Sequence, residues 1–301
     1  MVINLKILFA ALRFHQWSKN ILIFVPFFAA HRYNELDSFI SLCLAFFAFS
    51  LAASANYVLN DLIDLESDKT HPTKKNRPLA SGKLKVKNAI ILMISLITIA
   101  LIIASSLPLI FLQLLLLYLF IAILYSLFLK KEIIIDIVIL SSLYTLRIVL
   151  GGAAIDANIT YWLLAFSLFL FFSLALVKRY SELLFVSSNI NELSGDKSSY
   201  GRGYTFDDMP TILIIGISSG LLAVLVFALY INSPEITVLY QTPGILWFGL
   251  CILLFWISRL WLLVQRGVIK DDPVLFALKD KASLISVFSL FIIMWLAQLI
   301  N

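Results

Sequence analysis

Long apolar runs constrain this chain more than any other feature of its sequence. Several of them, such as residues 210–231, reach the roughly 18–20 residues with which a helix crosses a bilayer. Hydrophobic residues make up 61% of the 301 residues and charged residues 14%, whereas a soluble domain has about 45–50% and about 25%. Because such a composition cannot cover a surface that faces water, we predict an all-α polytopic membrane protein.

Nine transmembrane helices account for these runs, and we expect them to form a single domain over residues 1–301. Their approximate bounds are 20–31, 38–59, 88–107, 109–128, 133–154, 161–177, 210–231, 244–264 and 283–300. Residues 1–19 mix apolar side chains with three cations. This pattern predicts a short amphipathic lead-in helix at the membrane interface.

Positive charge gathers in alternate loops between these spans. Of the 23 Lys and Arg residues, 20 fall in five segments, 1–19, 60–87, 129–132, 178–209 and 265–282. Because cytoplasmic loops are enriched in Lys and Arg, we predict a cytoplasmic N-terminus and an outside C-terminus in a bacterial-type plasma membrane. The net charge of +5 then reflects topology, and we expect no nucleic-acid partner.

Three aspartates follow the second predicted span at helical spacing. If the helix continues past residue 60, Asp61, Asp64 and Asp68 share one face, and Asn56 and Asn60 lie on the same stripe. Like charges at this spacing repel unless a cation neutralises them, and Mg²⁺ prefers carboxylate oxygens and bridges to phosphates. The alternative is a solvated helix end, against which polar groups at membrane depth argue. We therefore predict that the three aspartates bind Mg²⁺.

Basic side chains follow the aspartates directly. Lys74 and Arg77 lie within ten residues of Asp68. There they suit phosphate charge that a metal leaves unpaired. The alternative is the ordinary enrichment of cytoplasmic loops in cations, which explains Lys83 and Lys85 well but not the pairing with an acidic motif. The two motifs together favour a metal–diphosphate site.

The segment from Asn60 to Gly82 resembles the first aspartate-rich motif of the UbiA superfamily of intramembrane prenyltransferases. The matching residues are Asn60-Asp61-x-x-Asp64-x-x-x-Asp68, Asn76-Arg77-Pro78-Leu79 and Gly82. The resemblance implies a helical bundle around a central cavity, with the loops 60–87, 178–209 and 265–282 at a cytoplasmic active site. It also implies that the motif holds a Mg²⁺-bound diphosphate, with catalytic roles for Asp61, Asp64, Asp68 and Asn60.

Departures from that pattern favour one branch of the superfamily. Members that act in quinone pathways carry a second motif, Asp-x-x-x-Asp, which residues 178–209 lack. Five segments instead resemble the decaprenyl-phosphate phosphoribosyltransferases. They are Arg13-Phe-His15-Gln16-Trp17-Ser-Lys19-Asn20, His71-Pro72-x-Lys74, Tyr125-Ser126-x-x-Leu129-Lys130, Leu146-Arg147 before Gly151-Gly152, and Lys178-Arg179-Tyr180-x-Glu182.

This branch implies transfer of 5-phosphoribose from phosphoribosyl diphosphate to a polyprenyl phosphate, with release of diphosphate, for cell-envelope glycan precursors. Mg²⁺ would act on the leaving diphosphate. The lipid phosphate is already an anion, so no strong general base is needed. The candidate substrate-binding residues are Asn56, Lys19, Lys74, Arg77, Tyr125, Lys130, Arg147, Lys178, Arg179 and Glu182.

Arg147 lies about 14 residues into its predicted span, or roughly 20 Å along a helix. A charge at that depth needs a partner or a wet cavity. It either contacts a lipid or orders a neighbouring helix, or it forms a purely structural interhelical bond.

Two other functions remain open from the sequence. One is a UbiA-type aromatic prenyltransferase, for example one that acts on 4-hydroxybenzoate, against which the missing second motif argues. The other is an anion transporter, which would predict inverted repeats with broken helices; the sequence shows neither.

Overall fold

The computed structural model describes residues 5–70, 74–189, 203–270 and 272–299. Every regular element in this part of the chain is a helix, which confirms the all-α prediction. The chain groups into two compact units: an N-terminal unit of residues 1–129 and 146–158, and a C-terminal unit of residues 130–145 and 159–301. The prediction of a single domain over the whole chain stays a prediction.

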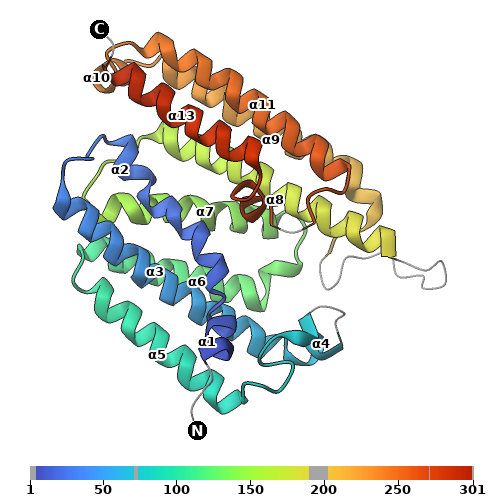
Figure 1. Cartoon of the computed structure of the whole chain (residues 1–301). Coiled ribbons are helices and arrows are strands. Elements are labelled where there is room, and N and C mark those ends of the chain that lie inside the picture. The colour runs from blue at the N-terminus through green and yellow to red at the C-terminus, as the bar shows by residue number, and fades with distance from the viewer. Residues whose placement is uncertain (1–4, 71–73, 190–202, 271, 300–301) are drawn as a thin grey trace. The chain divides into compact units, whose positions relative to one another are not determined.

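Helix α3 is the centre of the N-terminal unit and packs against α1, α5 and α6 (Figure 1). Small residues along α3, including Ala45, Ala48 and Ala52, are fully buried, which lets its neighbours approach closely. Helices α5 and α6 form a hairpin that turns at Pro108, the N-cap of α6. The elements of this unit are α1 (Leu5–Leu12), η1 (Phe14–Phe24), α2 (Val25–Ala29), α3 (Leu36–Ile63), α4 (Leu65–Thr70), η2 (Lys74–Asn76), α5 (Val86–Ala104), α6 (Leu109–Leu127), and the C-terminal part of α7 (Ile135–Ala154).

The first expected span, 20–31, takes an unexpected form. It is built from the 3₁₀ helix η1 and the five-residue α2, and Pro26 lies near the N-terminus of α2. Contacts at both ends lay this segment along α3: Arg13 pairs with Asp61 near one end of α3, and Phe27 meets Phe39 near the other. A 3₁₀ helix rises about 2.0 Å per residue, so a short sequence runs along much of α3.

Helix α8 is the centre of the C-terminal unit and packs against α9 and α11 (Figure 1). Ser173 of α8 joins all three helices, because its hydroxyl donates to Gly216 O at 2.7 Å and accepts from Trp261 Nε1 at 3.0 Å. The elements are η3 (Leu129–Lys131), the N-terminal part of α7, α8 (Tyr161–Asn189), η4 (Phe206–Asp208), α9 (Met209–Ile231), α10 (Ile236–Leu239), η5 (Pro243–Ile245), α11 (Leu246–Gln265), α12 (Pro273–Ala277) and α13 (Lys281–Leu299).

Eight helices of the described residues are long and apolar enough to cross a membrane, starting with Leu36–Ile63 and ending with Lys281–Leu299. Large apolar side chains such as Phe248, Phe288 and Ile285 are exposed on these helices. Since a monomer in water rarely exposes so much apolar surface, the exposed side chains suit contact with lipid. The two helices that cover most of the segment 20–31 have only 11 and 5 residues and are not among these eight. The count of nine spans and the orientation of the termini therefore stay predictions.

Candidate active site

A cluster of paired charges, here called the acidic cluster, lies at the end of α3. Its members are Asp61, Asp68, Arg13 and Arg77. Arg77 Nη1 donates to Asp61 Oδ1 at 3.1 Å and to Asp68 Oδ2 at 2.6 Å. The Arg13 guanidinium forms a second ion pair with Asp61 and lies 5.0 Å from the centroid of the Tyr57 ring. Two buried carboxylates therefore share Arg77, and Asp61 also pairs with Arg13.

The helix that carries these acids does not continue as predicted. Helix α3 ends at Ile63, and Asp64 is its C-cap with φ −89° and ψ 9°. The chain bends there and resumes as α4, and the Ser67 hydroxyl donates to Asp64 O at 2.9 Å. The bend keeps Asp61 and Asp68 on one side, where Arg77 joins them, while half-buried Asp64 lies at the bend itself. The uninterrupted three-aspartate stripe is therefore corrected to two joined aspartates and a third at a helix break.

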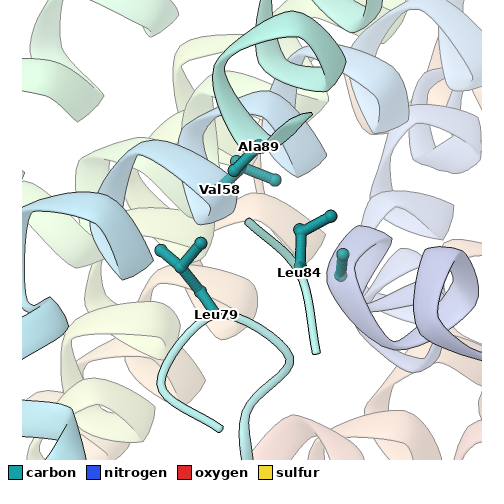
Figure 2. Close-up of a cluster of buried hydrophobic side chains, with 5 residues drawn as sticks. Val58, Leu79, Leu84 and Ala89 are labelled. Carbon is teal, nitrogen blue, oxygen red and sulfur yellow. The ribbon is translucent and has the colours of Figure 1, made fainter. Parts of the chain in front are cut away.

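An apolar cluster fixes the basic loop over this helix end. Leu79 and Leu84 of the loop pack with Val58 of α3 and Ala89 of α5, and each is at most 5% exposed. Figure 2 shows these four side chains converging from the loop and the two helices. The loop turns back through Gly82, whose φ of +73° favours glycine. This packing holds Arg77, two residues before Leu79, within reach of the aspartates.

The polar atoms of the acidic cluster suit a hard divalent cation. Carboxylate and amide oxygens are ligands that Mg²⁺ accepts. The Oδ1 atom of Asn56, one turn before Asn60, is buried and has no hydrogen-bond partner among the described residues. Among the residues that the structure describes, no group of three His, Cys, Asp or Glu side chains is arranged around one point. Arg13 and Arg77 supply the neutralising charge in this arrangement, so a bound cation would have to displace at least one of them.

A second polar group lies deeper in the N-terminal unit, around Arg147. Its Nε donates to Asn20 Oδ1 at 3.2 Å, and Asn20 Nδ2 donates to Ser50 Oγ at 2.9 Å. The guanidinium lies 5.0 Å from the centroid of the Phe49 ring, a cation–π contact. Arg147 is only 6% exposed and joins α7, η1 and α3, which favours the interhelical bond among the roles expected for it.

Close packing of α7 against η1 accompanies this bond. A Cβ atom added at Gly151 would lie 2.0 Å from Ile23 O, a distance that no side chain tolerates. Gly151 therefore allows the backbones to approach closely, as expected for small residues between membrane helices.

The remaining predicted phosphate-binding residues are divided between the two units. Lys19, Lys74 and Tyr125 belong to the N-terminal unit, where Lys19 is 6% exposed and the other two are half-buried. Lys130 and Lys178 belong to the C-terminal unit and are half-buried. Residues 71–73, with the His71-Pro72 variant, and residues 190–202 of the predicted loop 178–209 lie outside the described residues.

A group in the C-terminal unit, here called the buried lock, consists of Asp136, Arg179, Glu182 and Tyr204. Arg179 is 0% exposed, its Nη2 lies 2.7 Å from Asp136 Oδ2, and its Nη1 pairs with Glu182. The Tyr204 hydroxyl donates to Asp136 Oδ1 at 2.6 Å. Burial and this hydrogen bond raise the pKa of Tyr204, so the phenol keeps its proton. Arg179 and Glu182 thus meet protein groups in this structure.

Sequence reasoning did not assign a site role to Arg13 or Tyr204. Arg13 lies in the segment that resembles the phosphoribosyl-transferring branch, and its φ of 50° is rare for a residue other than glycine. Tyr204 lies in the loop 178–209, next to a glycine, and only the fold reveals that Asp136 is its partner. Arg13 lies between α1 and η1, and Tyr204 lies shortly before η4. In both cases the available sequence signal for a site role was a polar residue at a break between helices.

A comparison with family models matches residues 21–297 to the UbiA prenyltransferase family. The solved structure of a UbiA homolog from Archaeoglobus fulgidus bound to GPP and Mg²⁺ has a TM-score of 0.69, with 15% identity over 95% of this chain and 99% of that one. At this identity the likeness shows the fold.

Curated relatives agree with the family match. Nodulation protein NoeC of Azorhizobium caulinodans is 32% identical over 93% of this chain and 89% of its own length. The uncharacterized protein y4nM of Sinorhizobium fredii is 36% identical over 90% of this chain, which spans about half (52%) of that protein. The decaprenyl-phosphate phosphoribosyltransferase of Mycobacterium tuberculosis is 34% identical over 58% of this chain and 59% of its own length. Taken with the helical architecture, these matches show that the chain belongs to the UbiA prenyltransferase family of integral membrane transferases.

Proposed function

We propose that this protein transfers 5-phosphoribose from phosphoribosyl diphosphate to a polyprenyl phosphate and releases diphosphate. One observation carries the proposal: the acidic cluster places two buried carboxylates and two arginines at the end of a membrane helix, beside a basic loop. Such a cluster suits a metal-bound polyphosphate, since carboxylates hold the metal and arginines meet phosphate oxygens. The M. tuberculosis relative and a Corynebacterium glutamicum relative, 35% identical over 58% of this chain, carry the name of this reaction.

Asp61, Asp68 and Asp64, with Asn60 and Asn56, are the residues that would hold Mg²⁺. When bound there, Mg²⁺ would stabilise negative charge on the leaving diphosphate. A homologous structure with bound Mg²⁺ supports this assignment, as does the buried, unsatisfied Asn56 Oδ1.

The chain's own cations would bind the remaining charge of both substrates. Arg77 and Arg13 would turn from the aspartates to phosphate oxygens, and Lys19, Lys74, Lys130 and Lys178 are further phosphate ligands. Tyr125, another candidate substrate-binding residue, lies near the C-terminal end of α6, five residues before Lys130 of η3. Electrostatic stabilisation of phosphate charge by these cations would supply most of the rate enhancement. We place this site on the cytoplasmic face, where the sequence gathers Lys and Arg.

A paired assay on the protein purified in detergent with Mg²⁺ tests the reaction. One arm offers labelled phosphoribosyl diphosphate with polyprenyl phosphate, and the other offers a prenyl diphosphate with 4-hydroxybenzoate. We expect label from the first arm in the lipid fraction and no product in the second. Product in the second arm alone would overturn the proposal in favour of an aromatic prenyltransferase.

A further inference from the structure

The backbone is strained at the end of the short turn that carries Lys130 and Lys131. This segment, residues 129–134, is here called the basic turn. Ile134 has φ 66°, in the left-handed region, which a β-branched residue rarely adopts. Such a conformation is unfavourable, and it persists only where the surrounding structure imposes it. The basic turn is therefore held in its shape by contacts from elsewhere in the C-terminal unit.

Tyr204 supplies the contact that holds the strained residue. The Ile134 N–H donates to the Tyr204 hydroxyl at 2.7 Å, and the hydroxyl in turn donates to Asp136 Oδ1 at 2.6 Å. Tyr204 is 1% exposed, so water does not compete for these bonds. One phenol thus joins the end of the basic turn to the first turn of α7.

Arg179 fixes the acceptor of that phenol. Its guanidinium is completely buried between Asp136 and Glu182 and lies 5.8 Å from the centroid of the Tyr204 ring. If Arg179 left this position to bind a phosphate, Asp136 would stay buried without its cation, which is strongly unfavourable. In this structure Arg179 therefore holds Asp136 in place.

The neighbouring glycine brings the two segments into direct contact. A Cβ atom added at Gly203 would lie 2.7 Å from Lys131 O. Just after Tyr204, the backbone N–H of Thr205 donates to Asp208 Oδ2 at 2.8 Å. The segment that carries Tyr204 is thus itself fixed against the turn at the start of η4.

We propose that Tyr204, Asp136 and Arg179 are positioning residues that fix the basic turn so that Lys130 meets a phosphate of the donor. This inference rests on the proposed function. A lysine side chain gives up conformational freedom when it binds an anion. Fixing its backbone beforehand removes part of the ordering cost from the binding step. Loss of the lock therefore weakens donor binding more than it slows the transfer itself.

Tyr204→Phe tests the proposal, because it removes the bridging hydroxyl and keeps the ring. We expect the KM for phosphoribosyl diphosphate to rise about fivefold, which corresponds to about 1 kcal/mol, with kcat within about twofold. Because Tyr204 acts through Lys130, Tyr204→Phe should leave KM unchanged in a Lys130→Ala background. Independent, multiplied KM effects in the double variant would overturn the proposal.

Ser173→Ala is the matched control, since Ser173 is also a buried hydroxyl with two hydrogen bonds in the same unit. It should lower the melting temperature without raising KM. If Ser173→Ala raised KM as much as Tyr204→Phe does, the effect of Tyr204→Phe would reflect a general loss of stability. That result would overturn the proposal.

Hydrogen–deuterium exchange of the peptide covering residues 129–137 gives a readout that needs no turnover. We expect faster exchange there in Tyr204→Phe and not in Ser173→Ala, and unchanged exchange would refute the lock. If the wild type neither binds nor uses phosphoribosyl diphosphate, the proposed function fails. The exchange result then still decides whether Tyr204 fixes the basic turn.

Discussion

The acidic cluster and the buried lock both pair arginine with aspartate, but they differ in access to solvent. In the acidic cluster the Arg13 and Arg77 side chains are 21% and 28% exposed, so water and a ligand can reach them. In the buried lock Arg179 and Asp136 are both 0% exposed. Because breaking a dry ion pair leaves a buried charge without compensation, the lock stays closed, whereas the acidic cluster can exchange partners. The first arrangement suits binding and the second suits positioning.

Asp61→Ala gives the largest expected effect on activity. The change removes the carboxylate that Arg13 and Arg77 share, and with it a proposed Mg²⁺ ligand. We expect transfer of phosphoribose to fall at least about 100-fold, as for loss of a preorganised group at a developing charge. Initial rates with Mg²⁺ in detergent measure it.

Glu66→Ala is the control for that variant. Glu66 lies in the same segment, but its side chain is 84% exposed and pairs only with Lys69 among the described contacts. Activity should stay within about twofold, as for exposed pairs of little energetic weight. Equal losses in both variants would contradict a specific role for Asp61.

Arg179→Met gives the largest expected effect on stability. It leaves Asp136 buried without its cation, which lowers the free energy of unfolding by about 3–5 kcal/mol. Thermal unfolding in detergent measures the loss. Changing both partners, in Asp136→Leu/Arg179→Met, should restore much of it, because an apolar pair carries no desolvation cost.

Lys178→Ala, one residue away, sharpens the contrast. Lys178 is half-buried rather than enclosed, so its loss should change stability by at most about 0.5 kcal/mol while raising the KM for the donor. If Lys178→Ala were as destabilising as Arg179→Met, the division between binding and positioning residues would be wrong.

Arg13→Gln tests whether the acidic cluster exchanges partners. The change removes a cation that competes with Mg²⁺ for Asp61, so we expect the apparent Kd for Mg²⁺ to fall about fivefold, or about 1 kcal/mol, the upper range for partly exposed pairs. The rise in melting temperature with Mg²⁺ concentration measures this Kd.

Arg32→Gln is the control in the same unit. Arg32 lies between α2 and α3 and donates to Ile155 O, just after α7, at 2.6 Å. Its loss should leave the Kd for Mg²⁺ unchanged. An unchanged Kd in Arg13→Gln would mean that Arg13 does not compete with the metal.

The smallest expected effect concerns the partly exposed pair of Arg259 and Asp280. Hydrogen bonds from Arg259, at 2.7 and 3.0 Å, and from Ser283 lower the pKa of Asp280 from 3.8 to about 2. A lowered folded-state pKa contributes stability above pH 4 that is lost as the pH falls towards 2. Melting temperatures between pH 5 and pH 3 should therefore fall less in Arg259→Met than in the wild type. If the melting temperatures of the wild type and of Arg259→Met fell in parallel with pH, this ion pair would not be the cause of the acid sensitivity.

The sequence predicted the parts of the molecule that depend on local pattern. Apolar runs of about 20 residues specify membrane helices, since each run must satisfy its own backbone in lipid. The motif from Asn60 to Gly82 located Asp61, Asp68 and Arg77 of the acidic cluster, because these three lie within one short stretch of chain. It did not locate Arg13, which lies 48 positions before Asp61. The break at Asp64 was not visible, since a bend depends on the loop that packs over it through Leu79 and Leu84.

What the sequence determined by itself is the membrane-spanning all-α class, the family, and the acidic motif with its neighbouring cations. Only the tertiary structure decided which arginine belongs to which acid. Lys178 and Arg179 look alike as neighbours in the sequence, yet α8 exposes the first in part and buries the second against Asp136, 43 positions earlier in the chain. The reason is physical: a charge acquires its role from its burial and its partner, and both are set by helices that meet only after folding.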